Sequence, residues 1–151
     1  MQRYEEAMVD ETVHAIGAGL LAVQALGKPL HLGPPLTAMP DLNEDLASIA
    51  VDAFWDGCVG EGNAALQAQE QASREEGAAQ AYLNGVAAEE ALHAELAWDT
   101  VEWILGRKDV AARTLLGEAL TLEPTPSGEE EAQARYTHVL SEAKARLRSM
   151  L

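Results

Sequence analysis

The sequence has few basic residues, few aromatic residues and a single cysteine, and each scarcity excludes a class of protein. Ten Lys and Arg residues stand against 25 Asp and Glu, a net charge of −15. A nucleic acid or an anionic membrane would repel such a chain, so neither is an expected partner. Cys58 has no second cysteine to pair with. Aromatic residues make up 5% of the chain, so alanine and leucine must fill most of the core, a composition that favours helices.

Long apolar runs are also absent. No stretch approaches the roughly 20 apolar residues that span a bilayer. The N-terminal residues Met-Gln-Arg-Tyr-Glu-Glu lack the basic and apolar regions of a signal peptide. Without these features and without a disulfide, the expected location is the cytoplasm.

Apolar residues recur with the helical period of 3.6 along most of the chain, and no useful length shows the alternation of a strand. The fold class predicted is therefore all-α, an antiparallel helical bundle. The expected helices cover residues 3–26, 43–72, 77–106, 109–120 and 128–149.

Two features of the connections refine this expectation. Residues 27–42 contain four prolines and cannot form a regular helix, so they predict one long crossover loop, in which His31 is an ordinary loop residue. Asp41 or Asn43 is the expected cap of the second helix, and Ser127 with Glu130 forms an expected capping box for the last.

The segment 86–105 carries the strongest functional signal. Read as a helix, it places Glu90 and His93 within the apolar stripe, because residues three and four apart share a face. A buried carboxylate needs a charge partner, a proton or a metal ion. A Glu-x-x-His pair on an inward face is also a pair of metal ligands, since this spacing directs both groups at one point.

The chain repeats this pattern once. Asp10 to Ala15 matches Glu89 to Ala94, with an acidic pair, two other residues and then His-Ala, 79 residues apart. The first copy contributes Glu11 and His14 as candidate ligands on the inner face of the first helix.

A third carboxylate, Glu61, falls on the inner stripe of the second helix. Gly57, Gly60 and Gly62 surround it. Each glycine destabilises a helix by about 1 kcal/mol relative to alanine, so close approach of a neighbouring backbone is the expected reason for them. Cys58, in the same stretch, is expected to pack as a small apolar residue.

These motifs resemble those of the ferritin-like di-iron carboxylate proteins. More narrowly, they are similar to bacterial ferritin-like domain proteins in which two helices carry Asp/Glu-Glu-x-Arg-His-Ala and another carries Gly-Cys-x-x-Glu. The matching stretches are residues 10–15, 89–94 and 57–61, and the proline-rich crossover and Glu-Leu-Ala-Trp at 95–98 also match. The resemblance covers roughly residues 4–106.

The resemblance implies a ferritin-like bundle over residues 1–123, with residues 124–151 forming a helix packed on it or on a partner chain. It also implies two bound iron ions, or manganese in their place, and an oxidoreductase that reacts them with dioxygen or peroxide. The residues matching the family's ligands are Glu11, His14, Glu61, Glu90 and His93.

The chain departs from the family pattern in two ways. The arginine before each histidine is Val13 in one copy and Leu92 in the other. The family's first helix, which supplies a further glutamate, would precede residue 1, so five of six ligands are expected. The sixth would come from the last helix, from a second chain or from nowhere.

Three functional classes follow. The first is a carboxylate-bridged di-metal protein. The second is a metal-free ferritin-like scaffold that acts in oligomerisation or partner binding. The third is a bundle whose inner acids recognise a cationic ligand or partner. A homodimer is expected because Trp98, Trp103 and the apolar edge of helix 77–106 would otherwise meet solvent.

Overall fold

The computed structural model describes residues 2–29 and 45–151, and every regular element in these ranges is helical, with no strand. The all-α prediction is therefore confirmed. The described residues form two compact units, divided after Asn43. Most of the expected crossover, with His31, Asp41 and Asn43, lies outside the described residues.

The described residues of the first unit form one helix, α1 (Gln2–Leu26). It ends where Gly27 adopts φ +62°, a left-handed conformation that glycine takes without steric cost. The Gly27 N–H donates to the Val23 carbonyl at 3.0 Å, which closes the last turn. This end agrees with the sequence expectation.

The second unit begins with three helical segments in succession, α2 (Leu46–Asp52), η1 (Ala53–Glu61) and α3 (Gly62–Ala72). Asp45 is the N-cap and accepts from the Ser48 N–H at 2.8 Å. That bond and a second from the Ser48 hydroxyl lower the pKa of Asp45. The middle segment, η1, is a π-helix, whereas the sequence predicts one continuous α-helix.

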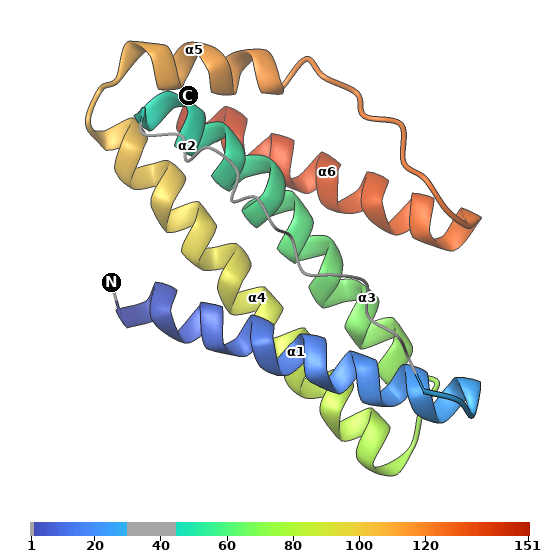
Figure 1. The fold of residues 1–151 in the computed structure, drawn as a ribbon. Helices are drawn as coiled ribbons and strands as arrows, with labels where there is room; N and C mark the ends of the chain where they lie inside the picture. The colour runs from blue at the N-terminus through green and yellow to red at the C-terminus, as the bar shows by residue number, and fades with distance from the viewer. Residues whose placement is uncertain (1, 30–44) are drawn as a thin grey trace. The chain divides into compact units, whose positions relative to one another are not determined.

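A short turn after α3 leads into α4 (Gly77–Gly106), which matches the predicted helix 77–106. Gly77 has φ +62°, so the turn needs the conformational freedom of glycine. Figure 1 shows α4 running back along η1 and α3. The antiparallel arrangement of this pair follows from the short connection.

Two further helices complete the second unit. Helix α5 (Val110–Ala119) packs against α2 and the end of α4, and α6 (Glu130–Met150) packs against α3 and η1 (Figure 1). The largest fully buried side chains come from four of these elements, and they are Phe54, Val59, Val101, Ile104, Leu116 and Leu147.

The predicted capping box at the start of α6 is wrong. The N-cap residue is Glu129, and no side chain caps the helix. Gly128 has φ +99°, which turns the chain between Ser127 and the first helical turn and so removes Ser127 from the N-cap position. Residues 122 and 123, in the segment before α6, are instead bound to the C-terminal half of that helix. The buried Lys144 ammonium donates to the Leu122 carbonyl and to Glu123 Oε1.

None of the helices in the described part of the chain is long and apolar enough to cross a bilayer.

Gly57 of η1 packs closely against α4. A Cβ atom there would overlap the Cβ of Ala97, so Gly57→Ala should cost about 1–3 kcal/mol of unfolding free energy. Gly85 on α4 has open space around its Cα, and Gly85→Ala should instead stabilise the helix by up to about 1 kcal/mol. Urea unfolding of both variants measures the difference. Equal effects of the two substitutions would contradict the close packing at Gly57.

Candidate metal centre

Glu61 is the last residue of η1. It follows Gly57 by four residues, nearly one turn of the wide π-helix. The contact of Gly57 with Ala97 therefore indicates that this side of η1 faces α4. Helix packing thus brings the Glu61 carboxylate towards α4, and Glu61 is only partly exposed.

Glu90 and His93 lie one turn apart on α4. His93 Nδ1 is 3.2 Å from Glu90 Oε2, within hydrogen-bonding distance. The side chains are 8% and 10% exposed for Glu90 and His93, respectively. The inward position that the sequence predicts for this pair is therefore observed, with a carboxylate and an imidazole directed at one point.

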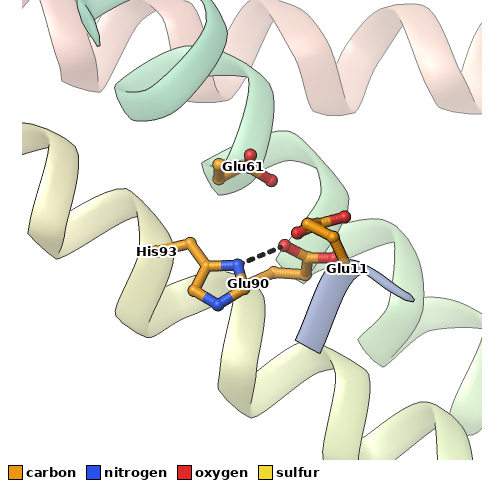
Figure 2. A group of neighbouring side chains, drawn as sticks. All are labelled: Glu11, Glu61, Glu90 and His93. Carbon is orange, nitrogen blue, oxygen red and sulfur yellow. Dashed lines mark hydrogen bonds and ion pairs between the residues drawn. The ribbon is translucent and has the colours of Figure 1, made fainter. Parts of the chain in front are cut away.

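Within the second unit, Glu61, Glu90 and His93 form one cluster. One ligand atom from each residue lies within 4.8 Å of those of the other two. In Figure 2, Glu61 comes from η1, Glu90 and His93 come from α4, and a dashed line marks the contact between Glu90 and His93. Two elements separated by α3 and a turn thus contribute donors to one position.

The charges in this cluster do not balance at neutral pH when the imidazole is neutral. Glu61 and Glu90 are both acids, and two carboxylates in a poorly solvated site repel each other unless a proton or a cation lies between them. Protonated His93 neutralises one of the two charges. A divalent ion would neutralise both, and its usual ligands in such a setting are carboxylate oxygen and imidazole nitrogen.

The other two predicted ligands, Glu11 and His14, lie on α1 in the first unit. His14 Nδ1 is 3.9 Å from Glu11 Oε1, and the Glu11 side chain is 54% exposed. The spacing repeats that of Glu90 and His93. The second unit thus brings together three of the five predicted residues, and α1 carries the remaining two as a pair.

On α4, Glu95 has a specific partner from another helix. Arg146 of α6 donates two hydrogen bonds to the Glu95 carboxylate, at 2.7 and 3.1 Å, and its guanidinium lies 4.4 Å from the Trp98 ring centroid. The bond from Arg146 lowers the pKa of Glu95 and raises the pKa of Arg146. The sequence signal for this pair is weak, since it consists only of the position of Arg146 three residues after the buried Ala143 and so on the same side of α6.

This pair predicts a pH-dependent contribution to stability. A glutamate whose pKa is lowered on folding stabilises the fold above its ordinary value of 4.5, and the effect is lost as the pH falls through the folded pKa. Since the Glu95 side chain is 56% exposed, Glu95→Gln should cost under about 1 kcal/mol at pH 7 and still less at pH 3. Urea unfolding at both pH values measures this. An equal cost at both would contradict the prediction.

Cys58 lies on the α6 side of η1, buried as the sequence predicts. Burial raises the pKa of its thiol to about 12, so the thiol stays protonated at neutral pH. Cys58 lines a cavity of about 340 Å³ between α3, α4 and α6, together with Trp98, Glu95 and Arg146. None of the three clustered residues of the candidate metal centre lines it.

Two tryptophans and one histidine lie outside the cluster. Trp98 is 5% exposed, so its own chain covers it without a partner, whereas Trp103 is 54% exposed and has the Arg107 guanidinium 3.8 Å above its ring. The His138 side chain is 61% exposed and lies 3.8 Å from Glu142, outside the cluster.

Comparison of the chain with the models of known protein families, with curated proteins and with solved structures found no match.

Proposed function

We propose that this protein is a ferritin-like metal-binding protein that holds iron or manganese at Glu61, Glu90 and His93. The observation that carries the proposal is the convergence of these three donors within 4.8 Å in a partly buried site. Carboxylates with imidazole suit iron and manganese. Bound iron would supply redox chemistry towards dioxygen or peroxide.

The spacing of the donors supports the proposal. Ligand atoms about 2.1 Å from one ion lie up to about 4.2 Å apart, so a separation within 4.8 Å requires only small side-chain rotations. In this proposal Glu11 and His14 supply two further ligands, because their spacing on α1 repeats that of Glu90 and His93 and the family resemblance assigns both.

Metal analysis of freshly purified protein tests the proposal directly, followed by calorimetric titration with Mn(II) and, without oxygen, Fe(II). At a metal concentration 100 times Kd, binding should raise the melting temperature by about 5–10 °C. The shift should shrink as the pH falls, because the ligating imidazoles must be neutral. No bound metal, together with no shift at millimolar Mn(II) or Fe(II), would overturn the proposal.

A second candidate is a metal-free scaffold that acts in association. The 3.2 Å contact between His93 Nδ1 and Glu90 Oε2 favours it, since a protonated imidazole would neutralise the buried carboxylate without a metal. For such a scaffold, substituting His93 with glutamine should lower the melting temperature equally with and without Mn(II). For the metal protein, the same substitution should chiefly reduce the Mn(II)-dependent shift.

A further inference from the structure

Helix α1 carries a stripe of exposed apolar side chains. Val9, Val13, Ile16 and Leu20 follow one another at spacings of four, three and four residues, and they are 54% to 66% exposed. Alternating spacings of four and three residues form the repeat by which two helices pack along each other in a coiled coil. The stripe is therefore suited to pairing with another helix.

This stripe lies on a different side of α1 from the candidate ligands. At 100° per residue, its mean direction is roughly 160° from that of Glu11 and His14. A helix that directs these two residues towards a metal ion would turn the apolar stripe away from it. The stripe therefore needs a separate explanation, and the explanation does not depend on metal binding.

The charges of α1 indicate which helix would fit. All its acidic residues precede Thr12, and residues 12–26 contain no Asp, Glu, Lys or Arg. Two parallel copies would bring the acidic halves together, where like charges repel. Two antiparallel copies, centred between Val13 and Ile16, would instead place each acidic half against an uncharged half.

We infer that α1 is the interface of a homodimer in which two copies of the helix pair antiparallel along this stripe. Val9 then packs against the partner's Leu20, and Val13 packs against the partner's Ile16. A two-fold axis relates the two copies, so each contact occurs twice. Burying each such side chain removes on the order of 100 Å² of apolar surface. The four side chains from each chain bury about 800 Å² in total, the area of a weak interface that forms at high protein concentration.

This surface replaces the one that the sequence suggested for a dimer. Trp98 is buried within its own chain and is not available to a partner. Trp103 is exposed but is stacked by Arg107. The apolar stripe of α1, in contrast, has four exposed apolar side chains in a row and no charged side chain among them.

Light scattering of the full chain at high micromolar concentration, with EDTA present, tests the interface independently of any metal. The wild type should be a dimer. Ile16→Glu puts a charge at the centre of the stripe and should raise the dissociation constant by about 100-fold or more. Ala15→Glu, which adds the same charge at an exposed position roughly 130° around the helix from the stripe, should leave the dimer intact. Circular dichroism confirms that both variants keep their helices.

Cysteine cross-linking tests the orientation in a Cys58→Ala background. Antiparallel pairing predicts that a mixture of Val9→Cys and Leu20→Cys chains forms a disulfide under mild oxidation and that Val9→Cys alone does not. A monomeric wild type, equal dissociation by Ile16→Glu and Ala15→Glu, or efficient cross-linking of Val9→Cys with itself would each overturn the inference. Since no metal takes part, none of these results bears on the proposed metal centre.

Discussion

Replacing Glu61 with alanine should weaken Mn(II) binding by more than about 100-fold, because even the loss of a residue that only supports a ligand costs 10- to 100-fold. Glu61 is the only donor of the cluster on η1, so no neighbouring residue of that segment replaces it. Calorimetric titration gives the affinity, and melting curves with and without Mn(II) give the coupling to folding.

The matched control is Glu102→Ala, which removes an exposed acid on the same helix as Glu90. It should leave both the affinity and the metal-dependent shift unchanged. Without metal, Glu61→Ala removes a carboxylate that repels Glu90, so its melting temperature should equal or exceed that of the wild type. A Glu61→Ala protein that binds Mn(II) as tightly as the wild type would contradict the assignment.

The contribution of α1 can be measured in the same assay. Glu11→Ala should weaken Mn(II) binding if the pair of Glu11 and His14 completes the ligand set. Glu5→Ala, which removes an acid six residues before Glu11 on the same helix, should not weaken it. An unchanged affinity of Glu11→Ala would remove α1 from the site and leave the three-residue cluster as the whole centre.

Phe54→Ala should cost about 3–5 kcal/mol of unfolding free energy, since it empties a large volume that the core cannot refill. The Phe54 side chain is fully buried, and its ring lies edge-on to Trp55 and Trp98, with centroids 5.0 and 6.1 Å away. Urea unfolding followed by circular dichroism measures the loss.

Trp103→Ala is the control for this experiment, because it removes a larger aromatic side chain from an exposed position. Its loss should stay near 1 kcal/mol or below, the value of an exposed stack on Arg107. Similar losses for the two variants would show that Phe54 does not occupy the centre of the core.

Sequence periodicity predicted the helices well where local signals agree with packing. The bounds of α4 match the expected 77–106, because a long run of good helix formers lies between Gly77 and Gly106. The expected helix 128–149 begins instead at Glu130. Its start depends on the left-handed conformation of Gly128, which a capping motif does not reveal.

The candidate site was predictable where its residues share a helix. Glu90 and His93 follow from a spacing of three, and Glu61 from its row on the second helix. The pairing of Glu95 with Arg146 could not be predicted from the sequence, because the two residues are 51 positions apart and meet only when α6 packs beside α4. The burial of Lys144 was missed for a related reason, since its partners lie in the segment before α6.

The π-helical geometry of η1 determines how insertions and deletions in this segment would affect the direction of Glu61. A π-helix turns fewer degrees per residue than an α-helix, so η1 changes the angular phase between α2 and α3, and a single helical wheel cannot represent residues 46–72. Deleting one residue within η1 would rotate Glu61 relative to α2 by one residue's turn of the π-helix, somewhat less than the roughly 100° of an α-helix. The nine residues of η1 therefore set the aim of Glu61 by their number as well as by their identity, and insertions or deletions there would act as changes of the site itself.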